Sequence, residues 1–196
     1  GVMLRFFDEI GGLRFDSLRT TLVAVAIASM VIGNLQALKQ NNVKRILAYS
    51  SIAHLGYMMV AFMTATTMGT TAIVFYLVTY FLSTLAAFGV VTLLSDAKGD
   101  AEDVSSYTGL FWRKPVIACV FTAALLSLAG IPLTAGFIGK FYILAAAMQT
   151  SLWVSSIVLV LSSVVGLYYY LRIITAMFTE QQVFVAEERT VHRFFY

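Results

Sequence analysis

The stretch that decides the fold of this chain is residues 115–148, PVIACVFTAALLSLAGIPLTAGFIGKFYILAAAM, an apolar run with Lys140 as its only charged residue. A straight helix of this length would measure ~50 Å, whereas the hydrocarbon core of a bilayer is ~30 Å thick. The letters AGIPLTAG in its middle offer a way to break such a helix. Proline removes a backbone hydrogen bond and clashes with the preceding turn, and glycine relaxes the backbone. We therefore predict two half-helices joined by a non-helical linker, with the break at Gly130, Pro132 and Gly136.

The composition places the rest of the chain in the same apolar environment. Apolar residues make up 60% of the 196 positions and charged residues 12%, against roughly 45–50% and about 25% in soluble domains. In lipid every backbone polar group must be satisfied within the protein, which leaves helices or a closed barrel. Barrel strands alternate apolar and polar residues over about ten positions, but the apolar runs here are continuous and longer. The sequence predicts an all-α, polytopic membrane protein with one discontinuous helix.

Five apolar segments fall in or above the range of about 17–25 residues that one crossing needs. They are residues 21–38, 46–64, 71–94, 115–148 and 152–178. Together they form the predicted transmembrane bundle, 21–178. Residues 1–20 are expected to hold the end of a preceding helix and an extracytoplasmic connector, and 179–196 a cytoplasmic tail. Because the chain starts on a glycine in an apolar stretch, we interpret it as a fragment of a longer protein.

Basic residues gather in alternate connections between these segments. The connections 65–70 and 149–151 carry no charge, whereas the other two connections and the C-terminal end hold most of the lysines and arginines. These are Lys39, Lys44, Arg45, Lys98, Arg113, Lys114, Arg172, Arg189 and Arg193. The positive-inside rule therefore places loops 39–45 and 95–114 and the tail in the cytoplasm. Only Arg14 and Arg19, ahead of the first segment, oppose this assignment.

Lys140 is the strongest candidate for a functional residue. It lies nine residues from Gln149, hence ~13 Å from that end of the segment and close to the membrane centre. An ionisable group at that depth costs several kcal/mol, so it indicates an ion or proton path by default. Broken helices mark such sites in transporters, because irregular backbone is tolerated only beside protein or a water-filled cavity. The alternative is a lysine that only packs or extends to the interface.

His54 is the second candidate, and Tyr49 a weaker third. His54 lies nine residues from Arg45, ~14 Å deep, and histidine commonly relays protons because it titrates near neutrality. A histidine hydrogen-bonded between helices for packing is the competing interpretation. For Tyr49, an anchor at the membrane interface and a member of the relay are equally open. The run Tyr168-Tyr169-Tyr170 is expected mainly to anchor the end of the last segment, although one of these tyrosines could face the interior.

The sequence carries no motif for a cofactor or metal of a recognisable kind. It has no GxGxxG, no Walker loop and no cysteine cluster, and its one cysteine, Cys119, is expected to be buried in an apolar run. No cofactor-binding or metal-binding residue is therefore predicted in this chain. The net charge of +3 gives no indication of nucleic-acid binding, and no such partner is expected.

Several stretches of the sequence resemble the antiporter-like membrane subunits of respiratory complex I. These are 36–40 QALKQ with 43–57 VKRILAYSSIAHLGY, and 126–132 LSLAGIP with 136–141 GFIGKF. Lysine at position 140 argues against a sister subunit that usually has glutamate there. The stretches 109–112 GLFW and 166–172 GLYYYLR narrow the resemblance to the N-type subunits of bacterial NADH-quinone oxidoreductase. The resemblance extends to about residue 178.

The resemblance implies a proton-translocating subunit built from two inverted five-helix repeats, of which this chain would hold most of the second. It implies that Lys140 carries protons on the outlet side, with His54 and Tyr49 on the path to it. NADH, FMN, iron–sulfur clusters and quinone would belong to partner subunits of a respiratory translocase in the bacterial inner membrane. Other membrane-arm subunits, including the sister antiporter-like subunits, and the lipid bilayer would be its partners.

Two rival interpretations remain open at this point. One is a subunit of a multi-subunit cation/proton antiporter with the same fold. The other is a purely structural membrane-arm component with a vestigial channel.

Overall fold

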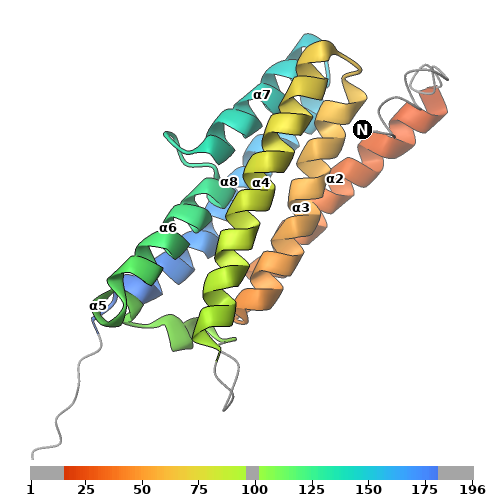
Figure 1. The fold of residues 1–196 in the computed structure, drawn as a ribbon. Helices are drawn as coiled ribbons and strands as arrows, with labels where there is room; N and C mark the ends of the chain where they lie inside the picture. The colour runs from red at the N-terminus through yellow and green to blue at the C-terminus, as the bar shows by residue number, and fades with distance from the viewer. Residues whose placement is uncertain (1–15, 96–101, 181–196) are drawn as a thin grey trace, which may run out of the picture.

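The computed structural model describes residues 16–95 and 102–180, and nearly all of this part is helical (Figure 1). The long helices are α2 (Asp16–Leu38), α3 (Val43–Met63), α4 (Thr67–Leu94) and α8 (Trp153–Phe178). Each is long and apolar enough to cross a membrane. Two shorter apolar helices, α6 (Pro115–Ala129) and α7 (Ala135–Gln149), lie between them in the chain. The chain is thus an all-α, multi-pass membrane protein.

The two short helices occupy the place of one long one. Each has 15 residues, or ~22 Å, and they follow one another along the bundle with the linker to one side (Figure 1). Both pack against α4 on one flank and α8 on the other. The backbone at 130–134 is not helical. That α6 and α7 together make a single crossing stays a prediction.

Two apolar clusters of buried side chains hold the bundle together. One lies toward the end where α2 turns into α3 and includes Ile46, Tyr107, Phe121 and Tyr170. The other lies toward the opposite end and includes Met30, Tyr57, Tyr76 and Ile143. Between them lie the break and its polar side chains, so the functional candidates sit at mid-length of the bundle.

The outer surface of the bundle is apolar, as a lipid-facing surface must be. Large apolar side chains on the outer faces of α4 and α8, such as Phe81, Leu85 and Leu161, are more than half exposed. Cys119 belongs to this outer surface and is exposed, so the expectation that it is buried was wrong. An apolar environment satisfies a thiol on the outside of a membrane helix as well as on the inside.

The connection between α4 and α6 is folded rather than a simple solvated loop. Its described part forms a short 3-10 helix η2 (Val104–Tyr107) and a single helical turn α5 (Leu110–Arg113). An isolated antiparallel bridge joins Asn42 to Asp103, and the Gly109 amide donates to the carbonyl of Ala176 in α8. The loop 39–45, the described part of the connection (102–114) and the end of α8 therefore meet at one end of the bundle, as the predicted topology requires.

The helix bounds differ from the predicted segments mainly at their starts. α2 begins at Asp16 rather than 21, α3 at Val43 rather than 46, and α4 at Thr67 rather than 71. The predicted segments counted only apolar residues, whereas helices begin with polar turns. Two of these starts are capped by side chains: Asn42 accepts from the Arg45 amide and Thr66 from the Gly69 amide. Most of the 1–20 and 179–196 assignments fall outside the described residues.

Candidate functional site

The site is built on the end of α6. Gly130 adopts a left-handed conformation with φ of +80°, and its amide and that of Ile131 both donate to the Leu126 carbonyl, which closes the helix. The chain then makes a tight turn in which the Thr134 amide donates to the Ile131 carbonyl across Pro132 and Leu133. Leu133 has a φ of +79°, at the position where a type II turn needs a positive value.

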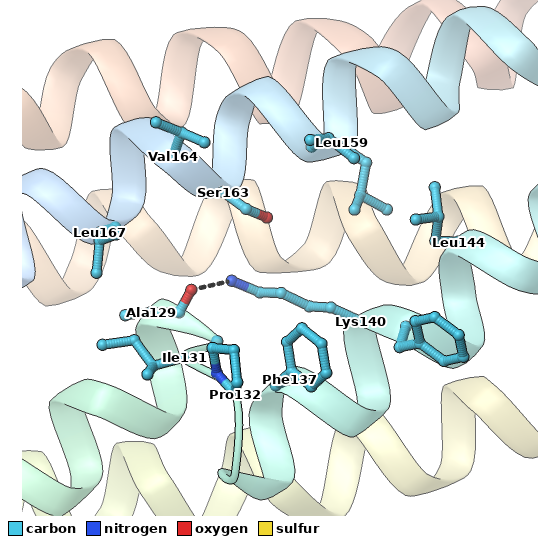
Figure 2. Close-up of a pocket in the computed structure, with 13 residues that line it drawn as sticks. Ala129, Ile131, Pro132, Phe137, Lys140, Leu144, Leu159, Ser163, Val164 and Leu167 are labelled. Atoms are coloured by element: carbon cyan, nitrogen blue, oxygen red, sulfur yellow. Dashed lines mark hydrogen bonds between the residues drawn. The ribbon is translucent and has the colours of Figure 1, made fainter.

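Closing α6 in this way leaves the carbonyls of Leu128 and Ala129 for another donor. A helix end presents four carbonyl groups without partners inside the helix, and these carry the negative end of the helix dipole. The Lys140 Nζ donates to both, at 3.1 Å to the Leu128 oxygen and 2.8 Å to the Ala129 oxygen. Figure 2 shows the lysine chain reaching from α7 back to the end of α6. Lys140 thus caps the half-helix that precedes it.

Two glycines make room for this arrangement. A Cβ atom added to Gly130 would lie 2.8 Å from the Lys140 Cδ and 3.0 Å from its Nζ, so the lysine lies directly on the glycine. A Cβ added to Gly136 would lie 1.8 Å from the Ser127 carbonyl oxygen, because the start of α7 packs tightly against α6. The Thr134 side chain begins α7 by accepting from the Phe137 amide.

An apolar cavity of about 250 Å³ adjoins the lysine between the break and α8. Its walls come from the linker and the start of α7 on one side, and from α8 on the other. Ser163 points its hydroxyl into this space near the Lys140 Nζ (Figure 2). Lys140 itself is only 7% exposed, so its amine lies in the protein interior rather than in lipid.

His54 lies in α3 and is 3% exposed. Both of its ring nitrogens are within hydrogen-bond distance of tyrosine hydroxyls: Nδ1 is 2.6 Å from Tyr76 on α4, and Nε2 is 3.3 Å from Tyr170 on α8. The ring of Tyr80 lies 5.0 Å from the imidazole, and its hydroxyl donates to Ser51. A histidine held between two hydroxyl groups has a donor or acceptor on each side, which is what a relay needs.

A second set of buried, hydrogen-bonded polar side chains is centred on Asn34. The Asn34 side chain on α2 donates to the Met30 carbonyl at 2.7 Å and to the Tyr57 hydroxyl at 3.4 Å. Its oxygen accepts from the Tyr169 hydroxyl at 2.9 Å. Asn34, Tyr57 and Tyr76 were missed by the sequence analysis. The signal that could have found them is an amide or phenol in the middle of a long apolar segment.

The predicted site residues are only partly brought together. Lys140 and His54 both face the interior at mid-length of the bundle, and Gly130, Pro132 and Gly136 surround the break. Tyr49 is half-buried against the apolar cluster that lies toward the turn from α2 to α3. No described hydrogen bond joins it to Lys140 or His54. Its place on a proton path stays a prediction. Of the three consecutive tyrosines, Tyr168 is 62% exposed, but Tyr169 and Tyr170 are both buried.

The acidic residues whose side chains the structure describes are at 102, 103 and 180, in the connection before α6 and just after α8. None of these carboxylates lies near Lys140. Within 16–95 and 102–180, no group of three or more His, Cys, Asp and Glu side chains could hold a metal ion. The chemistry that the described residues themselves offer is proton transfer between amine, imidazole and phenol groups.

Residues 3–166 match the family described as NADH:quinone oxidoreductase/Mrp antiporter, TM. The chain belongs to this family. The expected likeness to N-type subunits is also confirmed, since a protein named NADH-quinone oxidoreductase subunit N from Acinetobacter baumannii (strain AB0057) is 44% identical over 181 residues. That match covers 91% of this chain and 36% of the relative. The chain thus spans about a third of the length of such relatives.

Solved structures of two respiratory and antiporter assemblies contain chains of the same fold. A chain of respiratory complex I from Thermus thermophilus is 38% identical with a TM-score of 0.73, over 82% of this chain and 36% of that one. A chain of the Mrp complex from Dietzia sp. DQ12-45-1b is 27% identical with a TM-score of 0.83, over 92% of this chain and 33% of that one.

Proposed function

We propose that this chain forms part of the N-type membrane subunit of a bacterial NADH-quinone oxidoreductase and moves protons across the membrane through Lys140. The observation that carries the proposal is the position of the lysine: buried, at a helix break, and hydrogen-bonded to the Leu128 and Ala129 carbonyls. Its membership of the family and its likeness to subunit N support the same assignment.

Lysine suits this task because it exists in a charged and a neutral form. The ammonium form is stabilised by the carbonyl end of α6, where the helix dipole favours a cation. When the amine gives up its proton, that stabilisation is lost and the two carbonyls keep only a weaker, neutral donor. A change of charge in the membrane arm would therefore shift the proton on or off Lys140, which is how energy released elsewhere in a complex would reach this subunit.

His54 is the proposed partner of Lys140 on the path. Its two tyrosine neighbours, Tyr76 and Tyr170, come from different helices and give the imidazole hydrogen-bonding groups on both sides. A proton arriving at one ring nitrogen can leave from the other, because imidazole exchanges between two tautomers. Tyr49 remains a proposed member of this path, placed on the side where α3 begins.

The setting of the subunit is part of the same proposal. Its partners would be the other membrane-arm subunits, including sister antiporter-like subunits, embedded in the bacterial inner membrane. NADH, FMN, iron–sulfur clusters and quinone would be bound by partner subunits. The end of the bundle that carries loops 39–45 and 95–114 and the tail would face the cytoplasm, as the distribution of basic residues favours.

A second candidate is a subunit of a cation/proton antiporter complex. The likeness to a chain of the Mrp complex, with a TM-score of 0.83, favours it. Purification of the full-length protein with its partners discriminates between the two. Flavin and iron–sulfur absorbance in the purified complex supports the respiratory assignment, whereas cation-driven proton exchange without NADH oxidation supports the antiporter.

The test of the proposal uses the assembled complex, with the full-length protein, in vesicles. Lys140→Ala should slow proton transfer through this subunit by about 10²-fold or more, the contribution typical of a positioned proton-transfer group. NADH oxidation should fall together with proton transfer, because the two processes are coupled in the complex and the lysine can no longer change its charge. Lys140→Arg should also pump poorly despite keeping the charge, since arginine does not lose its proton. His54→Ala should slow proton uptake while NADH oxidation is less affected.

Lys44→Ala is the matched control, because it removes a lysine from the surface at the start of α3. It should pump like the unaltered complex. Assembly is checked for every variant by native electrophoresis and by flavin content. Full pumping by an assembled Lys140→Ala complex would contradict the proposal and favour a structural subunit with a vestigial channel.

A further inference from the structure

The ring of Tyr57 contacts both ionisable residues of the site. The Lys140 Nζ is 5.2 Å from the centroid of this ring, in the geometry of a cation–π contact. The imidazole of His54 meets the same ring edge to face, with centroids 5.5 Å apart and an interplanar angle of 80°. Tyr57 is itself buried, at 2% exposure. The Lys140 amine and the His54 imidazole thus share one buried aromatic neighbour.

The hydroxyl of Tyr57 is engaged with neither residue. It accepts from Asn34, whose own oxygen accepts from Tyr169. Among the described hydrogen bonds, none joins His54 to Lys140, and the two imidazole nitrogens are already within hydrogen-bond distance of Tyr76 and Tyr170. In this arrangement, no described hydrogen bond carries a proton from the imidazole to the amine.

Close packing of α2 on α3 sets the position of Asn34 relative to Tyr57. A Cβ added to Gly33 would lie 2.8 Å from the Ala53 amide nitrogen, and one added to Gly56 would lie 2.9 Å from the Ala26 carbonyl oxygen. Two helices that approach through glycine have little freedom to slide. This packing places Asn34 beside the Tyr57 hydroxyl, to which its amide donates at 3.4 Å.

A second connection between the two residues is closed. A crevice from His54 runs past Thr79 and Ser83 to Ser127 and Leu128, whose carbonyl Lys140 holds. The Ser83 and Ser127 hydroxyls bond to one another across it at 2.9 Å, and it has no room for a water molecule. Proton exchange along this crevice therefore depends on a change of conformation.

We propose that Tyr57 is the gate between His54 and Lys140, held closed by Asn34. The proposal rests on the proposed function of Lys140 as a proton carrier. Tyr57 is a positioning residue: its ring blocks the path and stabilises the charged lysine, and its displacement allows water or a hydroxyl group to bridge the two sites. A closed gate stops protons from leaking through the subunit when no energy is supplied.

Consecutive residues of α8 provide a way to open the gate. The Tyr169 hydroxyl donates to Asn34, and the Asn34 amide donates to the Tyr57 hydroxyl. The Tyr170 hydroxyl lies within hydrogen-bond distance of His54. Gly166, one turn earlier, leaves space beside the Tyr169 hydroxyl and the Asn34 oxygen. A small rotation or shift of α8 at this turn would move both contacts together, releasing Asn34 and reorienting His54 in one step. The movable element is thus one turn of a single helix.

The test measures passive proton leak in vesicles that contain the assembled complex without NADH. An imposed pH gradient should decay faster in Tyr57→Ala by about tenfold or more, the change that lowering a barrier by about 1.4 kcal/mol produces. Tyr57→Phe keeps the ring and loses the hydroxyl with its bond to Asn34. Its leak should therefore lie between that of the unaltered complex and that of Tyr57→Ala. Asn34→Leu should raise the leak with Tyr57 intact, because the bond to the Tyr57 hydroxyl is removed.

Two controls make the result specific to the gate. Phe121→Ala removes an equally buried ring from the other apolar cluster, and should leave the leak unchanged if the complex assembles. The double variant Tyr57→Ala with Lys140→Ala should return the leak to the unaltered level, because the path beyond the gate is gone.

The outcomes separate the gate from the proposed function. If Lys140→Ala stops pumping but an assembled Tyr57→Ala complex neither leaks nor loses coupling, the gate is refuted and the function stands. If the leak of Tyr57→Ala persists in the double variant, protons bypass Lys140 and the gate is again refuted. A leak caused by Ser127→Ala, with none caused by Tyr57→Ala, would assign the barrier to the crevice instead.

Discussion

The chain interrupts its helices in two very different settings. At the break between α6 and α7, the freed carbonyls of Leu128 and Ala129 are bonded by a buried lysine. At the connection from α4 to α6, freed groups meet other backbone: the Val43 amide donates to the Glu102 carbonyl, and the Val104 amide to the Asn41 carbonyl. The first interruption uses a titratable side chain where the second uses groups that never change charge.

This difference follows from depth in the membrane. The α4–α6 connection lies at an end of the bundle, where Glu102 is 43% exposed and charges are solvated. Water or neighbouring loops can satisfy backbone there at little cost. At mid-length neither is at hand, so the protein must supply a donor, and a lysine there brings a charge whose burial is costly. A residue whose burial costs free energy at such a depth indicates function. Ion pairs at the surface carry no such indication, because they cost and contribute little.

Gly130→Ala should have the largest effect of the three changes that probe this comparison. A Cβ at a φ of +80° is strained by about 1–2 kcal/mol, and it would also displace Lys140 from the two carbonyls. We expect proton pumping to fall nearly as far as in Lys140→Ala, measured as the rate of proton uptake per assembled complex. Gly89→Ala is the control, because nothing lies within 4 Å of its added Cβ. Equal pumping by both variants would show that the capping contact is dispensable.

Pro132→Ala should have an intermediate effect. Proline presets the backbone at the second position of the 131–134 turn, and without it the halves of the broken helix are freer to extend toward each other. The Thr134 amide and hydroxyl still bond to the Ile131 carbonyl, so we expect assembly to survive and proton uptake to drop by only a few-fold. The other proline, Pro115, begins α6, and Pro115→Ala should pump normally. A larger loss from Pro115→Ala would move the sensitive point away from the break.

Glu102→Gln should have the smallest effect. It removes the 3.6 Å ion pair with Lys44 but keeps the backbone bonds of the loop. Exposed pairs typically contribute about 0.2–1 kcal/mol, so the unfolding temperature of the complex should drop slightly at low salt and not at high salt. Pumping should be unchanged. A loss of pumping as large as that of Pro132→Ala would mean that the loop is part of the proton path.

The sequence alone determined the class of the protein and the location of its break. Continuous apolar runs exclude a soluble fold, and the length of 115–148 against the thickness of a bilayer requires an interruption, which the structure has at 130–134. These are local properties: composition, segment length and the conformational limits of glycine and proline act within a few turns. Lys140 and His54 were found in the same way, from polar residues at depth.

Only the tertiary structure decided which groups those residues meet. The partners of His54 are 22 and 116 positions away in the chain, and Asn34 and Tyr169 are 135 positions apart. When a membrane helix is apolar all round, its pattern does not say which face turns inward. That choice depends on packing between helices, where small residues such as Gly33 and Gly56 allow close approach. For this reason the sequence pointed to an ionisable pair, and only the fold brought the Tyr57 ring into contact with both residues.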